Sequence, residues 1–465
     1  MKKIKADYKR PLVLVIGDLI IFPLSYIAAY YLRSLFSPLE TFGTILPVSF
    51  IVLATFCYLF IYYIFGMFDQ KRDYFYWRSF IFLFISVLVA GIFSSFLKYI
   101  IFLHPIGRGI YFIANLMILS LSSLWRFSSS NLFKYLIKPT NTVIIGTEKP
   151  GQDIAEIIHK EKKDFKILGF LNDQKDKIEI NLNDTILPFL GFTQQINSLV
   201  KEHKIDLVVN SAPIISNPLS SKAILSAQLS GTRVLDISEM YQLIKERVPI
   251  DYIQDNWFIK AKGFQRLDNS FLPKFKRFLD ATLSSLLLVI SLPIWLLIAL
   301  MIKINSKGPI FYSQQRVGQN ESPFSLYKFR SMIEKAEKDK ALWADENDKR
   351  ITATGRILRK LHLDELPQLI NVLKGEMSLV GPRPERPEFV EDLEKVIPYY
   401  SMRHSVKPGL TGWAQVNYPY ASSVEDAKEK LEYDLYYISH MTFLMDIRIL
   451  IQTLQNVFLG RERHT

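Results

Sequence analysis

The sequence predicts a membrane protein in three parts: four N-terminal transmembrane helices, a Rossmann-like α/β domain, and a C-terminal monotopic α/β domain with a re-entrant membrane helix. Three observations predict this class. Long uncharged runs crowd the first 137 residues, strand and helix patterns alternate over 141–262, and a further uncharged run at 281–302 precedes a series of short motifs. A chain of 465 residues is long enough for the domains expected at 1–137, 141–262 and 272–465.

Four apolar segments near the N-terminus predict membrane spans at 12–32, 44–66, 79–100 and 109–127. Each has the roughly 20 residues that a helix needs to cross a bilayer. Asp18 interrupts the first segment, and a carboxylate inside a membrane is usually paired or functional.

The basic residues predict the orientation of this helical part. Lysines and arginines precede the first span, lie between the second and third, and follow the fourth, so both ends of the bundle are expected in the cytoplasm. The net charge of +12 is concentrated at these flanks, which favours anionic lipid over nucleic acid as a partner. The single cysteine, Cys57, excludes a disulfide framework and a cysteine-based zinc cluster.

The central region predicts a parallel sheet. Apolar strands at 141–146, 166–171 and 205–210 alternate with helical patterns such as 152–160. The glycine loop after the first strand, 146–151, lacks the second glycine that lets a pyrophosphate approach the backbone closely. A structural or regulatory module is therefore favoured over an active dinucleotide site.

The apolar run at 281–302 is predicted to be a re-entrant helix, about 278–302, that enters and leaves one leaflet. Ser291 and Pro293 near its middle predict the kink, because proline breaks the helical hydrogen-bond ladder. Both flanks are basic, so both ends favour the cytoplasm. The alternative is a proline-kinked full span, which would put the following domain outside the cell.

An acidic pair followed by proline, Asp364-Glu365-Leu366-Pro367, is the most informative motif. Alone, it would be explained by capping of a helix whose first turn holds Pro367. Cations surround it in the sequence, however: Lys328, Arg330, Arg356, Arg359, Lys360 and Arg383. A carboxylate pair among so many cations suits a diphosphate substrate.

Residues 272–465 resemble the bacterial sugar transferase family, the monotopic polyprenyl-phosphate phosphoglycosyl transferases. The resemblance rests on the kinked apolar segment and on ordered motifs: YKFRSM from Tyr327, LDELPQL from Leu363, VLKGEMSLVGPRPE from Val372, KPGLTGWAQVN from Lys407 and YDLYY from Tyr433. The N-terminal half resembles the long form of this family, in which four membrane helices and a Rossmann-like, CoA-binding-like cytosolic domain precede the transferase.

The resemblance implies a reaction in which Asp364 attacks the sugar-linked phosphate of a UDP-sugar, releases UMP and holds the phosphosugar until undecaprenyl phosphate takes it. Glu365 would be catalytic as a ligand of Mg²⁺. This is the first membrane step in the assembly of exopolysaccharide, capsule or O-antigen repeat units. Phosphate-binding roles are implied for Lys328, Arg330, Arg359 and Arg383, and Asp434 matches an acidic position of the family.

The implied location is the bacterial plasma membrane, as a multi-pass protein with its catalytic domain on the cytoplasmic side, in contact with lipid and open to homodimer formation. A departure from the family pattern at Tyr418-Pro419-Tyr420 leaves the sugar undetermined. A membrane-tethered nucleotide-sugar dehydratase or oxidoreductase is the alternative enzyme, and a transporter or scaffold for polymer export is the alternative without catalysis. Four spans are few for a transporter.

Overall fold

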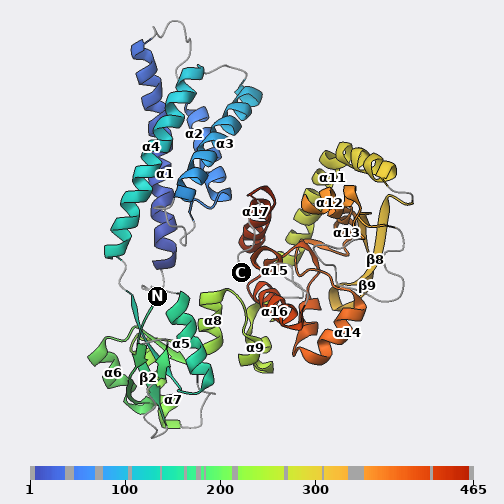
Figure 1. Cartoon of the computed structure of the whole chain (residues 1–465). Helices are drawn as coiled ribbons and strands as arrows, with labels where there is room; N and C mark the ends of the chain where they lie inside the picture. The colour runs from blue at the N-terminus through green and yellow to red at the C-terminus, as the bar shows by residue number, and fades with distance from the viewer. Residues whose placement is uncertain are drawn as a thin grey trace. The chain divides into compact units, whose positions relative to one another are not determined.

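Two compact units make up the computed structural model of the chain, residues 1–140 and 141–465 (Figure 1). The described residues are 6–36, 47–68, 77–102, 107–136, 139–161, 165–173, 180–182, 185–211, 218–265, 271–305, 308–333, 350–418 and 423–459.

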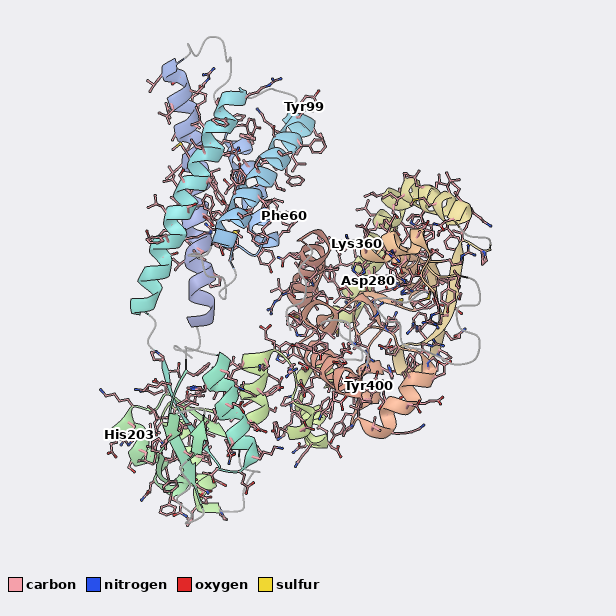
Figure 2. All side chains as sticks on the ribbon, viewed as in Figure 1. Phe60, Tyr99, His203, Asp280, Lys360 and Tyr400 are labelled. Atoms are coloured by element: carbon pink, nitrogen blue, oxygen red, sulfur yellow. The ribbon has the colours of Figure 1, made fainter. Side chains whose placement is uncertain are left out.

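The first unit contains four apolar helices, α1 (Ala6–Phe36), α2 (Val48–Ile64), α3 (Trp77–Phe102) and α4 (Arg108–Leu136). Aromatic side chains fill its centre, where the Phe22 and Tyr62 rings meet edge to face with centroids 5.0 Å apart. Large apolar side chains also cover its outside. Figure 2 shows Phe60 and Tyr99 projecting from the unit, and they are 42% and 75% exposed. A surface of this kind suits lipid rather than water, as expected of a membrane protein.

The carboxylate inside the first predicted span is paired. Asp18 on α1 accepts two hydrogen bonds from the Arg126 guanidinium on α4, at 3.0 and 2.7 Å, and both side chains are buried. The Arg126 guanidinium also lies over the Tyr62 ring, 4.9 Å from its centroid. Asp18 therefore joins α1 to α4, which accounts for a charge within an apolar helix.

The set of long apolar helices differs from the predicted one. The four described helices long enough to cross a membrane include 11–35, 79–101 and 108–129, but the fourth is 273–305 in the second unit. The predicted span at 44–66 contributes only the 17-residue α2, which begins after Pro47 and ends before Gly66, whose φ of +63° turns the chain out of the helix. A helix of 17 residues is about 26 Å long, slightly short of the ~30 Å hydrocarbon core.

The central region is an α/β structure around a five-stranded sheet of order β5-β2-β1-β6-β7. The β1–β6, β6–β7 and β2–β5 pairs are parallel, so the predicted parallel sheet is confirmed. The elements are β1 (Thr140–Ile145), α5 (Lys149–Glu161), β2 (Phe165–Asn172), β5 (Phe189–Phe192), α6 (Ile196–His203), β6 (Leu207–Asn210), α7 (Pro218–Leu229), β7 (Arg233–Asp236) and α8 (Ile237–Lys245), with a small antiparallel pair β3 (Ile180–Leu182) and β4 (Thr185–Leu187).

Each face of the sheet has its own apolar core. Side chains of α5 and α8 pack on one face, and those of α6 and α7 pack on the other. The glycine loop after β1 is explained by its own backbone, because a Cβ at Gly151 would lie 2.2 Å from the Gly146 carbonyl oxygen. Gly151 thus permits a tight turn, while the structural or regulatory role of the loop stays a prediction. Its Rossmann-like character beyond the parallel α/β architecture stays a prediction.

The C-terminal region is the predicted mixed α/β structure. It contains an antiparallel hairpin of β8 and β9 and a parallel pair of β10 and β11. Its elements are α11 (Phe271–Asn305), β8 (Phe311–Val317), β9 (Pro323–Phe329), α12 (Ala353–Lys360), α13 (Gln368–Lys374), β10 (Ser378–Val380), α14 (Pro387–Val396), β11 (Gly409–Thr411), α15 (Trp413–Asn417), α16 (Val424–Ser439) and α17 (Phe443–Leu459), with 3₁₀ turns η4 (Gln319–Glu321), η5 (Leu363–Glu365) and η6 (Tyr400–Ser405).

Helix α11 is bent. Arg277 near its start donates to the Leu373 carbonyl at the end of α13, whereas its last residue, Asn305, donates to Thr354 on α12. The intervening helix would be about 42 Å long if straight, but α12 and α13 are only about 12 and 10 Å long. Both ends reach these short neighbours because the helix changes direction along its length (Figure 1).

The two residues that predict the kink both lie inside α11. Pro293 lies inside α11, and the Ser291 hydroxyl donates to the Leu288 carbonyl at 3.1 Å. The Trp295 indole N–H in turn donates to Ser291 Oγ at 3.1 Å. Proline removes one backbone donor from the helical ladder, and a serine hydroxyl that bonds a carbonyl of the preceding turn also favours a bend. The bend is consistent with the predicted kink, although a bend alone does not define a re-entrant path.

A connecting segment, 246–265, ties the central sheet region to the C-terminal region. It contains η3 (Ile250–Tyr252), α9 (Asp255–Lys260) and α10 (Lys262–Gln265). The Trp413 indole N–H donates to the Glu246 carbonyl at 2.9 Å, and the Val248 N–H donates to the Glu432 carbonyl at 3.0 Å. The Glu432 carboxylate also accepts from the Ile250 N–H at 3.2 Å. These bonds fix the segment on α15 and α16.

Candidate functional site

The acidic pair lies in the 3₁₀ turn η5, between α12 and α13. His362 precedes it in the left-handed conformation, with φ of +54°, and this turns the chain sharply after α12. Pro367, rather than either acid, occupies the position that caps α13, and no side chain caps that helix. The capping explanation of the pair is therefore wrong, because both carboxylates lie before the cap. Asp364 is only 6% exposed.

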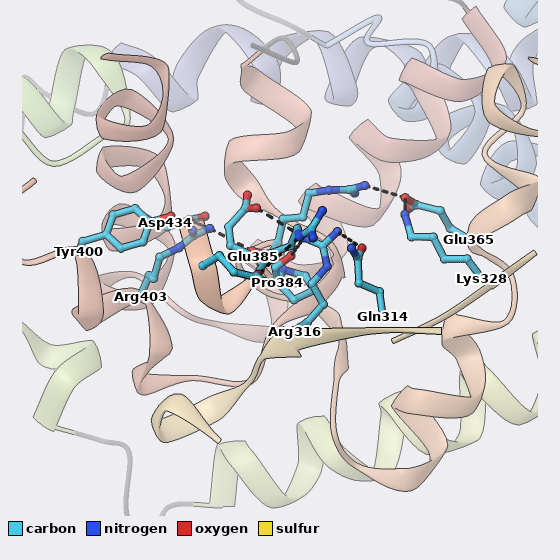
Figure 3. A network of polar contacts seen from close by, with 12 residues as sticks. Gln314, Arg316, Lys328, Glu365, Pro384, Glu385, Tyr400, Arg403 and Asp434 are labelled. Atoms are coloured by element: carbon cyan, nitrogen blue, oxygen red, sulfur yellow. Dashed lines mark hydrogen bonds and ion pairs between the residues drawn. The ribbon is translucent and has the colours of Figure 1, made fainter. Parts of the chain in front are cut away.

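Glu365 is held between two cations. Its Oε1 accepts from Lys328 Nζ on β9 at 2.8 Å and from Arg383 Nη2 at 2.7 Å (Figure 3). Burial opposes ionisation of this carboxyl, but Arg383 and Lys328 outweigh it and hold the pKa of Glu365 well below its usual range. Glu365 is thus a fixed anion.

Asp364 has a different environment from its neighbour. Burial raises the pKa of the Asp364 carboxyl, against the attraction of Lys328, and the negative charge of Glu365 raises it further. No ion pair of Asp364 is among the contacts seen in the described part of the chain. A desolvated carboxylate without a salt-bridge partner is more reactive than a paired one, so the two acids are suited to different roles.

The loop that carries Arg383 is fixed through its carbonyl groups. The Gly409 N–H donates to the Pro382 carbonyl at 2.8 Å, and the Val317 N–H donates to the Glu385 carbonyl at 2.9 Å. Two arginine side chains bond the two carbonyls that lie between Pro382 and Glu385. Arg403 donates to the Arg383 carbonyl at 3.1 Å, and Arg316 donates to the Pro384 carbonyl at 3.2 Å (Figure 3). Four consecutive carbonyls are therefore bonded, which fixes the backbone from which the Arg383 side chain reaches Glu365.

Asp434 is connected to this loop through Arg403. Its carboxylate accepts from Arg403 Nη2 at 2.8 Å, and the same guanidinium bonds the Tyr400 hydroxyl at 2.6 Å (Figure 3). Asp434 is 1% exposed. Arg403 thus links Asp434 to the Arg383 backbone. The substrate- or phosphate-binding role expected for Asp434 stays a prediction.

Arg403 and Arg316 were not predicted from the sequence. A signal for Arg403 was present, because Asp434 lies on α16 between the buried residues Leu431 and Leu435. A buried carboxylate requires a cation partner, and Arg403 is the partner it finds.

The remaining predicted cations are distributed around the acidic pair. Arg359 on α12 donates from Nε to Ser331 Oγ at 3.0 Å, and its charge lowers the pKa of Asp364. Arg330 follows β9 and is buried, with its backbone N–H donating to the Ile310 carbonyl at 2.9 Å. Lys328, Arg359 and Arg383 thus act electrostatically on the acidic pair, Asp364 and Glu365, which is called the dyad below. Asp434 is linked to the dyad through Arg403 and the Arg383 backbone.

The donor set at the dyad fits a hard dication. Mg²⁺ binds oxygen, commonly through one or two carboxylates together with substrate phosphates. Both cation contacts of Glu365 described above use Oε1, so Oε2 is the oxygen that would be offered to a metal. Lys328 and Arg383 would compete with such a metal for the same carboxylate, so the fit requires substrate phosphate to complete the ligand set.

A prediction concerns the pH dependence that Asp434 confers. Burial, against the attraction of Arg403, raises the pKa of Asp434 to about 6, whereas an unfolded aspartate has a pKa of about 3.9. The folded state thus holds this proton more tightly between pH 4 and 6, and the resulting stability is lost as the pH rises through 6. The Tm of the wild type minus that of Asp434→Asn should therefore fall between pH 4 and 7. A difference that rises with pH would mean that Arg403 outweighs burial.

A bent apolar helix joined to an α/β region, with a carboxylate pair set among cations, indicates a membrane protein with a strongly charged candidate site. The family model described as bacterial sugar transferase matches residues 271–460. The "Uncharacterized sugar transferase EpsL" of Bacillus subtilis (strain 168) is 41% identical over 189 residues, which are 40% of this chain and 88% of that protein. The chain belongs to the bacterial sugar transferase family.

Longer relatives extend the similarity. A "UDP-N-acetylgalactosamine-undecaprenyl-phosphate N-acetylgalactosaminephosphotransferase" of Aeromonas hydrophila is 38% identical over 237 residues, 50% of this chain and 54% of that one. A "UDP-glucose:undecaprenyl-phosphate glucose-1-phosphate transferase" of Xanthomonas campestris pv. campestris is 29% identical over 373 residues, 76% of this chain and 74% of that one. The chain thus spans about half the length of the Aeromonas protein and supports the resemblance to the long form.

The oxidoreductase alternative is not favoured. The family match covers the C-terminal region and not the central sheet. Tyr241 and Lys245 on α8 do have the Tyr-x-x-x-Lys spacing that such an enzyme would use. The Tyr241 hydroxyl, however, donates to Glu432 at 3.4 Å, and the Arg247 guanidinium lies over its ring. Tyr241 is thereby engaged in the contact with α16.

Proposed function

We propose that this protein transfers a sugar 1-phosphate from a UDP-sugar to undecaprenyl phosphate, giving undecaprenyl-diphospho-sugar and UMP. The observation that carries the proposal is a buried Asp364, with no ion pair seen among the described residues, next to a Glu365 fixed by Lys328 and Arg383. The named relatives from Aeromonas and Xanthomonas act on UDP-sugars and undecaprenyl phosphate, which supports the choice of substrates.

The first step is a displacement at phosphorus. A carboxylate oxygen of Asp364 attacks the sugar-linked phosphorus, the bond from that phosphorus to the bridging oxygen breaks, and UMP leaves with the bridging oxygen and its electron pair. The product is an aspartyl phosphosugar, a mixed anhydride that remains reactive. Lys328, Arg359 and Arg383 would bind the diphosphate and stabilise the charge that develops on the leaving group. A carboxylate nucleophile divides one difficult transfer into two easier steps.

The second step regenerates the enzyme. A phosphate oxygen of undecaprenyl phosphate attacks the same phosphorus, and the bond between that phosphorus and Asp364 breaks, which restores the carboxylate. Mg²⁺ held by Glu365 and substrate phosphates would neutralise the diphosphate and polarise its phosphorus–oxygen bonds. The fixed negative charge of Glu365 suits this role, and the fixed direction of Arg383 keeps the phosphate in line.

UMP release tests the proposal. Membranes that contain the protein would be supplied with undecaprenyl phosphate and, one at a time, with UDP-glucose, UDP-galactose, UDP-N-acetylglucosamine and UDP-N-acetylgalactosamine. One donor should give UMP and a lipid-linked sugar in equal amounts. Release of UDP instead of UMP would identify a different transfer, and turnover of NADH without UMP would identify the oxidoreductase alternative.

We further propose that the catalytic domain lies in the cytoplasm and that α11 is re-entrant. The bend of α11, the presence of Pro293 inside it, and the contacts of its two ends with α12 and α13 support this arrangement. Basic residues at both ends support it too, because a full crossing would leave one basic cluster outside. The arrangement would bring Asp364 to the headgroup level, where one site meets a soluble donor and a lipid acceptor.

Labelling should place both ends of α11 on the cytoplasmic side. Lys274→Cys and Lys303→Cys, each in a Cys57→Ser background, alter exposed side chains at the two ends. A membrane-impermeant maleimide should label neither in intact spheroplasts and both after lysis. Ser37→Cys in the predicted outer loop is the matched control and should be labelled without lysis. Labelling of either helix end from outside would reject the re-entrant path.

A second topological expectation concerns the kink itself. Pro293→Ala combined with Ser291→Leu restores the backbone donor and removes the hydroxyl that bonds the Leu288 carbonyl. The helix should straighten and UMP release should fall, while the central sheet region stays folded. Full activity in this double variant would mean that the bend depends on the contacts of the helix ends alone.

A further inference from the structure

Three side chains outside the carboxylate dyad gather from separate elements of the C-terminal region. Glu321 belongs to the turn of the β8–β9 hairpin, Glu394 to α14 and His404 to η6. One carboxylate oxygen of each glutamate and one ring nitrogen of the histidine lie within 4.8 Å of one another. We propose that these three residues form a site for a divalent transition-metal ion, for which Zn²⁺ is the probe.

Two carboxylates, those of Glu321 and Glu394, lie close together at this position. Burial raises the pKa of Glu394, and the neighbouring carboxylates of Glu321 and Glu391 raise it further, with no cation among the influences on this group. Two carboxylates that repel each other so closely are stabilised by a cation placed between them. A dication would neutralise both.

His404 supplies an observation that is independent of the acids. It is only 7% exposed, and its Nδ1 is buried without a hydrogen-bond partner in the described part of the chain. Buried polar atoms are nearly always bonded, so an orphaned nitrogen indicates a missing partner. A neutral imidazole nitrogen is the commonest metal ligand in proteins. If His404 served only to fill the core, its Nδ1 would remain without a hydrogen-bond partner, which is costly for a buried nitrogen.

The geometry requires only a small closure. Zinc binds nitrogen and oxygen at about 2.0–2.2 Å, so tetrahedral ligands lie about 3.4 Å apart. Glu321 and Glu394 are exposed, and rotation of their side chains can bring the oxygens inward onto the fixed imidazole. One imidazole and two carboxylates favour zinc and other divalent first-row transition metals over Mg²⁺, which prefers oxygen ligands alone. Water would complete the set.

Such an ion would join two elements that support the site of Asp364 and Glu365, the β8–β9 hairpin turn and η6. Asn320 and Glu321 are both left-handed, with φ of +51° and +60°, and Gln319 beside them donates to the Ser405 carbonyl at 3.1 Å. The hairpin continues into the strand that bears Lys328, and η6 contains Arg403. A metal at this position would clamp the hairpin turn to the element that supports the Arg383 loop. Its role is structural, not catalytic.

Metal binding to the full-length, tag-free protein in detergent tests the proposal. After chelator treatment, ZnCl₂ would be titrated calorimetrically in 5 mM MgCl₂, and Co²⁺ would be used to record a visible ligand-field spectrum. We expect one zinc equivalent that raises the Tm and that survives in an Asp364→Asn, Glu365→Gln variant. Glu321→Gln and Glu394→Gln should each weaken binding at least tenfold, and His404→Gln should change the Co²⁺ spectrum.

Glu391→Gln is the matched control, because this glutamate lies one turn before Glu394 on the same exposed side of α14. It should leave zinc affinity within about twofold. The proposal is overturned if the wild type binds no zinc below 1 mM, if the Glu321→Gln, Glu394→Gln double variant binds as the wild type does, or if the control weakens binding equally. The glutamate variants keep the test valid should His404→Gln fail to fold.

Discussion

Replacing Asp364 by asparagine is expected to abolish UMP release, by at least about 1,000-fold, while the protein stays folded. Asparagine has the same shape but no charge with which to attack phosphorus. Burial already raises the pKa of this carboxyl, so a neutral side chain in the same place relieves a desolvation cost. The measurements are initial rates of UMP release, the Tm, and mass spectrometry of the intact protein for the phosphosugar adduct.

The control for this variant is Asp392→Asn, which removes an exposed carboxylate on α14 whose partner is Lys395. It should release UMP at the wild-type rate. Retention of a tenth of wild-type activity by Asp364→Asn, with deamidation excluded by mass spectrometry, would show that this residue is not the nucleophile. An unfolded Asp364→Asn variant would be recognised by a lowered Tm and by a gel-filtration profile that differs from that of the control.

Glu365→Gln is expected to lower the rate of UMP release by about 100-fold or more, which is the usual loss when a charged group that organises a phosphate site is removed. The amide cannot pair with Lys328 and Arg383 as a carboxylate does, so both cations lose their common anchor. It is also a poor metal ligand. The Mg²⁺ concentration needed for half-maximal activity should therefore rise together with the loss of rate.

Chelation separates the metal role from the anchoring role. EDTA should stop the wild-type enzyme, and Mg²⁺ or Mn²⁺ should restore it. Activity that persists in EDTA would remove the metal from the mechanism and leave Glu365 as an anchor alone. Glu388→Gln, which removes an exposed carboxylate at the start of α14, should respond to EDTA and Mg²⁺ as the wild type does.

Local sequence patterns were sufficient for much of the fold. The apolar strands predicted at 141–146, 166–171 and 205–210 correspond to β1, β2 and β6. Such elements are set by the placement of apolar residues along the chain. The length of α2 was not predictable in this way, because apolar residues continue beyond Pro47 and Gly66 while the helix does not.

The candidate site was only partly visible in the sequence. The dyad and the cations Lys328 and Arg383 lie within short motifs, and the structure brings them into contact. The supporting arginines bond backbone carbonyls, and no sequence pattern specifies which carbonyl a distant guanidinium will meet. Arg403 is 20 residues from its carbonyl partner and 31 from Asp434, so its role depends on the tertiary fold.

The bonds of the connecting segment have a practical consequence for dividing the chain. A fragment that begins at the family-matched residue 271 would strip the Trp413 indole and the Glu432 carbonyl of their partners, Glu246 and Val248. Glu432 lies two residues before Asp434 on α16, so the loss of these bonds would disturb the helix that carries the partner of Arg403. Expression of a minimal soluble-side module should therefore start before Glu246. The stretch that folds together is therefore about twenty-five residues longer at its N-terminal end than the stretch that matches the family.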